Sequence, residues 1–535
     1  MTGDGFSANL AEGDNEDGDD PYQPPRTRRE KLLGKFLRSK RAWLVYGIIV
    51  ALVVAGVVIK VVYFPPSCPS SLAPADDGNP HDCVGLTDGS YVFNLALASV
   101  EAKILAENND VNQLAAAQHR PWVAIAYLLP MTLSKGSTQT LEATARQLTG
   151  AYIGQWEANH NSGMADGNTP LIKLYLVNEG ANETRWQVAV GQIIAATSNS
   201  LNVVAVAGLG TSIVATRQGA AEMSKAELAM FGTTITADDL NGSEYSSLVR
   251  IAPTNDDQVQ AALQFLHQLQ GGGKTAMLVR DTNNSDDYVT NWGNDVAADY
   301  RGAEGKFLGP NVTFDSSSSA VNSVLVNDAG YVCQDHPEVV FFAGRAQQLE
   351  IFAGALYTTC TAPITVISGD DDVIDTNTST DPQDYTSFTE ALNNGVSLYG
   401  TELAAAQEWS ACGTVPQSQA LAVRTFNQFQ LDYGQLLGGR FAAITDPKDV
   451  MLARDAVITA ATVIRRSKVQ SAGKLQYQQV MQYFGGLDFD KVAGVSGVIQ
   501  IGNFSTAKGD TVNKPVVIMQ HLGSGTEQCK AIKTP

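Results

Sequence analysis

Residues 203–240 read VVAVAGLGTSIVATRQGAAEMSKAELAMFGTTITADDL and contain the pattern that decides the fold. The first six residues are apolar and either β-branched or small, which is typical of a buried strand. A glycine-containing turn with Thr211 and Ser212 follows, and then a stretch with the apolar spacing of a helix. The short apolar run LAMFG at 228–232 and a polar loop complete the unit. A strand, a helix and a second strand in this order predict two parallel strands joined by a helical crossover.

The same alternation extends on both sides of this stretch. Apolar, β-rich runs occur at 122–130, 170–177, 202–208, 228–232, 274–280, 338–343 and 363–368. Segments with helical spacing lie between them, at 138–159, 184–198, 213–227, 255–270, 285–303 and 345–359. This pattern predicts an α/β fold in which helices flank parallel sheets. Because ligands of open α/β sheets bind beyond the carboxyl ends of the strands, the residues after each run are the place to look for a site.

From about residue 419 the pattern changes. Residues 419–436 and 450–467 have helical spacing, and the β-type runs 494–502 and 515–520 follow as a hairpin-like tail. A chain of 535 residues is also too long for a single core. One α/β lobe, then a second, then further helices and a β tail predict two lobes connected by several crossovers.

Residues 42–64, AWLVYGIIVALVVAGVVIKVVYF, form an apolar stretch interrupted only by Lys60. About 20 apolar residues span a bilayer, and a lysine near the end of the span can reach the interface. Eight basic residues lie just before it, between Arg26 and Arg41, and place this flank in the cytoplasm. We therefore expect a single-pass protein of the cell membrane, with a cytoplasmic tail at 1–41, a transmembrane helix at 42–64 and the large remainder outside the cell.

Two further observations concern this part of the chain. The acidic residues 1–25 contain almost no bulky core formers and predict a disordered tail. A cleaved signal peptide is the alternative to an uncleaved signal anchor. However, the apolar run is long for a signal peptide and no A-x-A site follows it.

The chain has a negative net charge that is unevenly distributed along the sequence. The whole chain has a formal charge of −19 at pH 7, and residues 65–535 hold 27 Lys and Arg against 47 Asp and Glu. An acidic domain has no electrostatic reason to bind nucleic acid. The sequence GGGKT at 271–275 resembles the end of a phosphate loop, but Gln268 stands where that motif needs glycine. We interpret this stretch as a turn.

The cysteines all follow the apolar stretch: Cys68, Cys83, Cys333, Cys360, Cys412 and Cys529. An even number confined to the exported part predicts disulfide bonds. Fifteen pairings can be drawn, and order along the chain favours Cys68–Cys83, Cys333–Cys360 and Cys412–Cys529. A metal site is the alternative, but no C-x-x-C occurs and the six histidines are scattered.

Several stretches together resemble the type I periplasmic binding proteins, specifically the branched-chain amino-acid (Leu/Ile/Val) binding group. The stretch 203–240 is similar to that group's strand, Ser/Thr turn, helix, short strand and polar loop. The other stretches are KTAMLVRDTNNSDDY at 274–288, EVVFFAGR at 338–345, DAVITAATVIRR at 455–466 and the Gly-Ser-Gly tail at 494–520. The resemblance extends over about 84–525 and implies two parallel-sheet α/β lobes with three crossovers.

The resemblance also implies domain boundaries. It places lobe I at 121–252 plus about 400–470, and lobe II at 253–399 plus about 471–525. Residues 65–120 remain as a disulfide-bearing N-terminal extension. This block, and a membrane helix in place of a lipidated cysteine, resemble a high-GC Gram-positive (actinobacterial) branch of the family.

In the resembled family, the first lobe binds an α-carboxylate through hydroxyls and backbone amides at a helix N-terminus. Free N–H groups and the helix dipole favour an anion there. Thr211 and Ser212 match the first of these places, and Thr234 and Thr236 match the second loop. The alternative for Thr211 or Ser212 is an N-cap, a role that is compatible with binding.

The second lobe of the resembled family covers its ligand with an aromatic ring and pairs the ligand's ammonium with a carboxylate. Tyr288 matches the aromatic residue, with an ordinary half-buried tyrosine as the alternative. Arg345 follows a strand and can pair with an anion, although we favour a surface position at a helix start. A gapless match favours Asp371 as the carboxylate, with Asp370 next.

Repulsion within the run Asp370–Asp372 predicts that at least one of these carboxylates faces water. A Ca²⁺ site is the alternative use of the three aspartates, but the D-x-D-x-D-G pattern is incomplete.

These features predict an extracytoplasmic solute-binding protein or receptor. Its small, polar, amino-acid-like ligand would lie between two lobes and shift an open–closed equilibrium. The expected partners are that ligand and an ABC permease or another membrane protein, for uptake or for sensing, and no cofactor is expected. The alternative is an interaction protein that kept the fold without a ligand. We do not expect an enzyme, because the sequence has no G-x-S-x-G, no H-E-x-x-H and no evident nucleophile–base pair.

Overall fold

The computed structural model describes residues 68–534 apart from a few short segments. These segments are 76–81, 134–136, 162, 168, 271–273, 303–304, 373–380, 414, 445, 468–474, 485–490 and 503–508. The predicted tail at 1–41 and transmembrane helix at 42–64 lie outside the described residues. None of the described helices combines the length and the apolar character that a bilayer crossing requires.

Lobe I is built on a seven-stranded sheet with the order β1-β2-β4-β3-β5-β6-β7. The strands are β1 (Ala73–Pro74), β2 (Cys83–Thr87), β3 (Trp122–Leu129), β4 (Leu171–Asn178), β5 (Val203–Gly208), β6 (Ala229–Gly232) and β7 (Leu248–Arg250). The five strands β3 to β7 pair in parallel, whereas β1 and β2 extend the sheet as antiparallel strands. Much of the expected N-terminal extension at 65–120 is therefore an integral part of lobe I.

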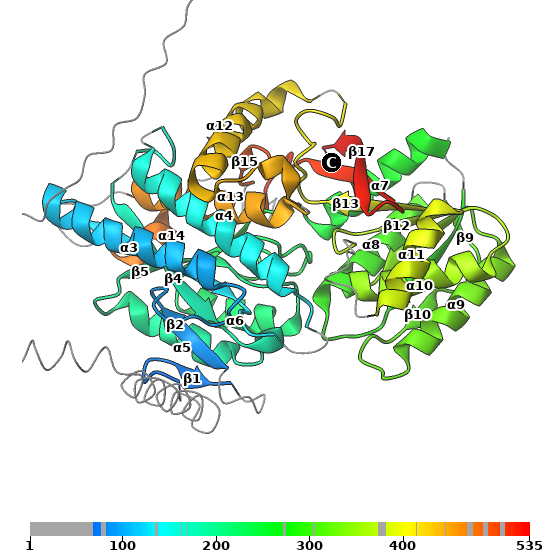
Figure 1. Ribbon diagram of the computed structural model, residues 1–535, viewed down its shortest axis with the longest axis horizontal. Helices are drawn as coiled ribbons and strands as arrows, with labels where there is room; N and C mark the ends of the chain where they lie inside the picture. The colour runs from blue at the N-terminus through cyan, green and yellow to red at the C-terminus, as the bar shows by residue number, and fades with distance from the viewer. Residues whose placement is uncertain are drawn as a thin grey trace, which may run out of the picture. The chain divides into compact units, whose positions relative to one another are not determined.

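Helices cover both faces of this sheet (Figure 1). One face carries α3 (Ala98–Gln118), α4 (Leu141–His160), α12 (Ala420–Leu437), α13 (Lys448–Arg466) and α14 (Tyr477–Phe484). The other face carries α5 (Trp186–Thr197) and α6 (Val214–Lys225). Strand β3 shows the two-sided burial directly, because Ile125 and Tyr127 join one core while Ala124 and Ala126 join the other.

Lobe II is built on an eight-stranded sheet with the order β10-β8-β11-β12-β13-β16-β17, with β9 paired to β8. Its strands are β8 (Thr275–Asp281), β9 (Lys306–Phe307), β10 (Val312–Phe314), β11 (Val339–Ala343), β12 (Ile364–Ser368), β13 (Val396–Glu402), β16 (Val516–Leu522) and β17 (Thr526–Lys533). One face packs against α7 (Asn255–Gln270) and α8 (Asp287–Gly302). The other packs against α9 (Val321–Asp335), α10 (Ala346–Thr359) and α11 (Pro382–Asn393).

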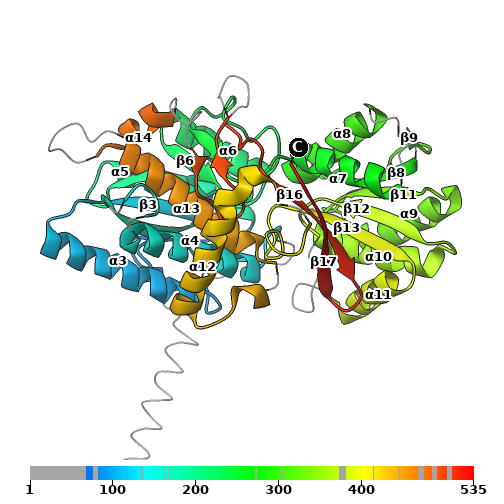
Figure 2. The same ribbon diagram turned by 90° about the horizontal axis from the view of Figure 1, so that it is seen from above.

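The chain passes between the lobes three times, as the two-lobed fold class requires. It crosses between β7 and α7, between β13 and α12, and a last time before β16 (Figure 2). The last crossing comes later than the expected boundary at about 471. Val480, Phe484 and Ile499 belong to the lobe I core, because α14 packs beside α13 against β5 and β6.

The β tail also differs from the expectation. The run 494–502 contributes β15 (Ile499–Gln500), which pairs with β14 (Lys491–Val492) in a separate small sheet. The hairpin at the end of the chain joins β16 to β17 instead, and β16 pairs antiparallel with β13. Strand β17 is mostly polar and half-exposed, as edge strands often are. It therefore has no apolar run by which the sequence could predict it.

The predicted cysteine pairing is confirmed. Disulfide bonds join Cys68 to Cys83, Cys333 to Cys360 and Cys412 to Cys529. The first links the start of the described chain to β2, and the second joins α9 to the C-terminal end of α10. The third attaches β17 to the segment that follows β13.

Candidate functional site

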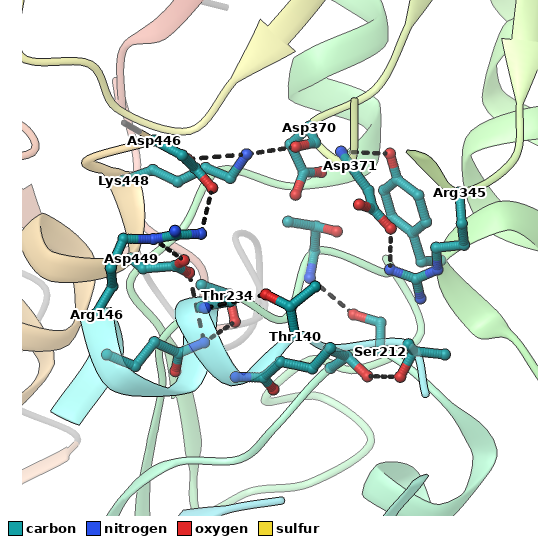
Figure 3. Close-up of a pocket in the computed structure, with 17 residues that line it drawn as sticks. Thr140, Arg146, Ser212, Thr234, Arg345, Asp370, Asp371, Asp446, Lys448 and Asp449 are labelled. Atoms are coloured by element: carbon teal, nitrogen blue, oxygen red, sulfur yellow. Dashed lines mark hydrogen bonds and ion pairs between the residues drawn. The ribbon is translucent and has the colours of Figure 1, made fainter. Parts of the chain in front are cut away.

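A cavity of about 100 Å³ lies where the two lobes meet, beyond the carboxyl ends of their parallel strands (Figure 3). All eight residues predicted from the sequence line it: Thr211, Ser212, Thr234, Thr236, Tyr288, Arg345, Asp370 and Asp371. Nine further residues complete the lining: Thr138, Gln139, Thr140, Ala143, Arg146, Gln147, Asp446, Lys448 and Asp449. The structure thus brings the candidate residues together at one place, while their contact with a ligand stays a prediction.

The lobe I side is a set of interlocked hydroxyls. The Ser212 hydroxyl oxygen accepts the backbone N–H groups of Thr236 (2.9 Å) and Ala237 (3.2 Å), which ties the loop after β5 to the loop after β6. The Thr234 hydroxyl donates to the Gly210 carbonyl (3.2 Å), and the Thr211 and Thr138 hydroxyls lie 3.0 Å apart. These bonds fix the positions of the polar groups that border the cavity.

The N-cap alternative for Thr211 and Ser212 does not hold. Helix α6 has Ile213 at its N-cap position, and no side chain caps it. The hydroxyls near this helix start are engaged with neighbouring loops instead.

Tyr288 of lobe II contacts both lobes beside the cavity. Its side chain is buried, and its backbone N–H donates to the Ser212 carbonyl of lobe I (3.0 Å). Its hydroxyl oxygen accepts the backbone N–H of Asp371 (3.2 Å). The Arg345 guanidinium lies over its ring, 4.5 Å from the centroid.

Arg345 is not the surface residue that we favoured from the sequence. It does stand at the N-cap position of α10, but its side chain is only 14% exposed. It binds Asp286 through two nitrogens, each at 2.8 Å, and Asp371 at 3.1 Å. Burial alone would lower the pKa of Arg345, but the carboxylates of Asp286 and Asp371 raise it, so the guanidinium stays charged. The charged guanidinium stays in the interior because it neutralises these two carboxylates.

The three consecutive aspartates after β12 have three different environments. Asp371 pairs with Arg345, and Asp372 accepts a hydrogen bond from His521 of β16 (2.9 Å). Asp370 is 8% exposed, and its Oδ1 has no hydrogen-bond partner among the described residues. Burial and the charge of Asp371 raise the pKa of Asp370 to about 7, against the opposing effect of Lys448. The fold separates the three carboxylates, pairs Asp371 with a guanidinium and Asp372 with an imidazole, and leaves the Asp371 side chain 28% exposed.

Sequence reasoning missed the ion pairs around the start of α13. Arg146 of α4 binds Asp446 (2.9 Å) and Asp449 (3.1 Å), and Lys448 binds Glu402 (2.9 Å) and Asp446 (3.3 Å). The ammonium of Lys448 also donates to the carbonyl of Asp370 (2.6 Å). The only signal was the charged run at 446–449 directly before a long apolar helix. Nothing local tied that run to the strand ends some 200 residues earlier in the chain.

The calcium alternative for the aspartates gains no support. Among the described residues, one group of three donors lies close enough to hold a metal ion, and it consists of Glu107, Asp110 and His160 on α3 and α4. Asp370, Asp371 and Asp372 form no such group.

Comparison with known proteins finds resemblance in structure only. No family model and no curated protein matches the sequence. A leucine-binding protein, LivK, from Thermotoga maritima superposes with a TM-score of 0.55 at 17% identity, covering 77% of this chain and 99% of that chain. The substrate-binding protein LivJ from Streptococcus pneumoniae, solved with isoleucine, gives 0.54 at 16% identity over 77% and 99%. A branched-chain amino-acid transporter protein from Thermus thermophilus with bound valine gives 0.53 at 13% identity over 78% and 97%.

These values establish the architecture. At such low identity the likeness concerns the fold, which is the two-lobed α/β fold of the type I periplasmic binding proteins.

Proposed function

We propose that this chain, which has the two-lobed fold of the leucine-binding proteins, is an extracytoplasmic solute-binding protein with an amino-acid-like ligand. The observation that carries the proposal is that residues of both lobes line the same cavity. Residues from both lobes, spread between Thr138 and Asp449, surround one cavity. Ligand sites of two-lobed proteins lie in such positions, because closure of the lobes then depends on occupancy.

The chemistry of the cavity supports a ligand with an ammonium group. Asp370, which lines the cavity together with Tyr288, offers a buried carboxylate oxygen without a described partner. A buried carboxylate is stable in its charged form only when a cation neutralises it. An ammonium at this position would supply that charge, while the hydroxyls and amides of lobe I would hold the other polar end of the ligand.

Thermal unfolding tests the proposal. The full-length chain is heated with each standard amino acid and with a panel of small polar metabolites. A ligand at about 100 times its dissociation constant stabilises the folded state by about 2.7 kcal/mol and raises the unfolding midpoint. If no compound in the panel raises the midpoint, the solute-binding role is contradicted.

The same experiment separates the second candidate, an interaction protein that keeps the fold without a ligand. One observation favours this candidate. Arg146, Arg345 and Lys448 all pair with carboxylates of the chain itself, so the cavity already satisfies its own cations. That candidate predicts a constant unfolding midpoint throughout the panel.

We also propose that the chain is anchored in the cell membrane by residues 42–64, with the lobes outside. The apolar length of this segment and its basic flank support the anchor. A partner in the membrane, such as an ABC permease or a signalling protein, would then receive the ligand or the closed form. Alkaline carbonate extraction of membranes tests the anchor: the chain should stay in the membrane pellet, and release into the supernatant would contradict it.

No catalytic step forms part of the proposal. The structural neighbours are described as a leucine-binding protein, a substrate-binding protein in complex with isoleucine and a branched-chain amino-acid ABC transporter protein with bound valine.

A further inference from the structure

Most of the residues that line the cavity have a polar side chain. Of the seventeen lining residues, Ala143 is the only aliphatic one and Tyr288 the only aromatic one. All others carry a hydroxyl, an amide, a carboxylate or a cation. Most of these groups are bonded within the chain. The choice among ligands therefore depends on the few lining side chains that are not.

Gln139 marks the position where a ligand's own polar group is needed. It lines the cavity and is 6% exposed. Neither its amide nitrogen nor its amide oxygen has a hydrogen-bond partner among the described residues. A buried amide with both its donor and its acceptor unsatisfied is costly, and native proteins rarely keep one without a partner.

The residues beside Gln139 are fixed in place. The Thr138 hydroxyl contacts that of Thr211 (3.0 Å), and the Thr140 hydroxyl caps α4 by accepting the Ala143 N–H (3.1 Å). A second glutamine on the wall, Gln147, is by contrast bonded within the chain. Its amide oxygen accepts from the Thr233 hydroxyl (3.3 Å), and its amide nitrogen donates to the Thr234 hydroxyl (3.4 Å). The wall thus contains one glutamine amide that is bonded within the chain, that of Gln147, and one that is not, that of Gln139.

The cations on the wall are already paired with carboxylates of the chain, which restricts the ligand further. Arg146 is held by Asp446 and Asp449, and Lys448 by Glu402 and Asp446. A ligand with an acidic side chain would have to displace one of these carboxylates from its cation. A ligand with a basic side chain would meet carboxylates that are already paired, apart from Asp370, which the proposed function assigns to the α-ammonium.

We infer that the ligand is an amino acid with a neutral polar side chain whose end both donates and accepts hydrogen bonds, a carboxamide being the best match to Gln139. This inference rests on the proposed function and names the ligand class of the same cavity. Asparagine and glutamine fit it best, serine and threonine fit it less fully, and leucine, isoleucine and valine do not.

Isothermal titration calorimetry on the full-length chain tests this with three ligands of nearly equal shape: asparagine, leucine and aspartate. Asparagine should bind about tenfold or more tightly than either of the others, because a site built for hydrogen bonds rejects an isostere that cannot form them. If leucine or aspartate binds as tightly as asparagine, the ligand class is wrong while the solute-binding role stands. If none of the three binds and no compound of the thermal panel raises the unfolding midpoint, both proposals fail.

The variant Gln139→Leu tests the assigned residue. The preference for asparagine over leucine should fall by about tenfold or more, since the amide that recognises the side chain is gone. The matched control is Gln113→Leu on α3, where the glutamine is exposed and outside the cavity, and it should leave the preference unchanged. Gln139→Met makes the same test with an unbranched side chain if Gln139→Leu does not fold. An unchanged preference in a folded variant would overturn the role of Gln139.

Discussion

Three identical residues in a row take three different roles in this protein. The turn after β12 directs Asp371 to Arg345 and Asp372 to His521, and it leaves one oxygen of Asp370 without a described partner at the cavity. Asp371 and Asp372 thus already have partners within the chain. Asp370 is therefore the better candidate for a ligand's ammonium, although the sequence match ranked Asp371 first.

The substitution Asp370→Asn should weaken the binding of an ammonium-bearing ligand by about 10- to 150-fold, the equivalent of the 1.5–3 kcal/mol typical of a charged hydrogen bond. Asp371→Asn should have a smaller effect on affinity, because Asp371 is paired with Arg345. Titration calorimetry on both variants measures the difference. A larger loss in Asp371→Asn would return the role to Asp371.

The same residue predicts a pH dependence of binding. Burial raises the pKa of Asp370 to about 7, so below that pH the carboxyl is largely protonated and cannot neutralise an ammonium. Affinity should therefore rise as the pH increases from about 6 to 8, and the slope should disappear in Asp370→Asn. Calorimetric titrations across this range check the sign, and an affinity that falls over the same range would contradict it.

The sequence pattern predicts which residues after the strand ends line the cavity, but it does not predict the residues that helix packing brings there. The polar positions after the strand ends, Thr211, Thr236 and Tyr288 among them, all line the cavity because parallel strands bring their carboxyl ends to one edge. Gln139, Arg146 and Lys448 could not be found in this way. Their places depend on how α4 and α13 pack, which is a tertiary arrangement without a local sequence signal.

At the scale of elements, the close contact between α4 and α13 positions one wall of the site. Two glycines of α4, Gly150 and Gly154, face the backbone of α13. A Cβ on Gly150 would collide with the carbonyl of Val450, and a Cβ on Gly154 would lie 2.8 Å from the carbonyl of Arg454. Arg146 lies one turn before Gly150, and Asp449 lies directly before Val450. The tight contact therefore sets the distance across which they pair.

Gly150→Ala should lower the free energy of unfolding by about 1–3 kcal/mol, because the helix backbones must separate to admit a methyl group. Gly191→Ala in α5 is the control. A Cβ there has nothing within 4 Å, so alanine should instead stabilise the helix by about 0.5–1 kcal/mol. Urea unfolding of both variants provides the comparison. Equal effects in the two would show that α4 and α13 are not tightly apposed.

The elements that sequence patterns predict best are those buried on both faces. Strands β3, β5 and β11 are continuous apolar runs and lie within two residues of their expected limits. Strand β13 was missed because VSLYGTE mixes polar and apolar residues, and its place in the sheet is set by pairing with β12 and β16. Helix α14 was missed as part of lobe I because its amphipathic pattern does not say which sheet it covers.

At the scale of the whole molecule, direct contacts join the lobes on one side of the cavity. The Val214 N–H donates to the Ser285 carbonyl (3.1 Å), and the side-chain oxygen of Asn291 accepts the Asp238 N–H (2.8 Å). Arg217 of lobe I lies 3.3 Å from Asp287 of lobe II. These contacts would be lost when the lobes separate, so they contribute to the balance between open and closed forms.

Arg217→Ala removes the cation of an ion pair whose carboxylate is buried. It should shift that balance toward the open form by about fivefold, the equivalent of roughly 1 kcal/mol, and weaken ligand binding by the same factor. Small-angle X-ray scattering should show a larger radius of gyration for the ligand-free variant. Lys225→Ala on the same helix is the control, because its partner Glu222 belongs to α6 and the pair does not join the lobes. A variant that scatters like its control would exclude a role for this ion pair in closure.

The most direct test of the whole account is a crystal structure of the protein grown with the amino acid that stabilises it most. The account predicts the ligand between the lobes, with its ammonium within hydrogen-bonding distance of Asp370 and its other polar groups against Gln139 and the hydroxyls of lobe I. A ligand bound elsewhere on the chain, with the space among Thr236, Tyr288 and Asp370 filled only by solvent, would contradict it.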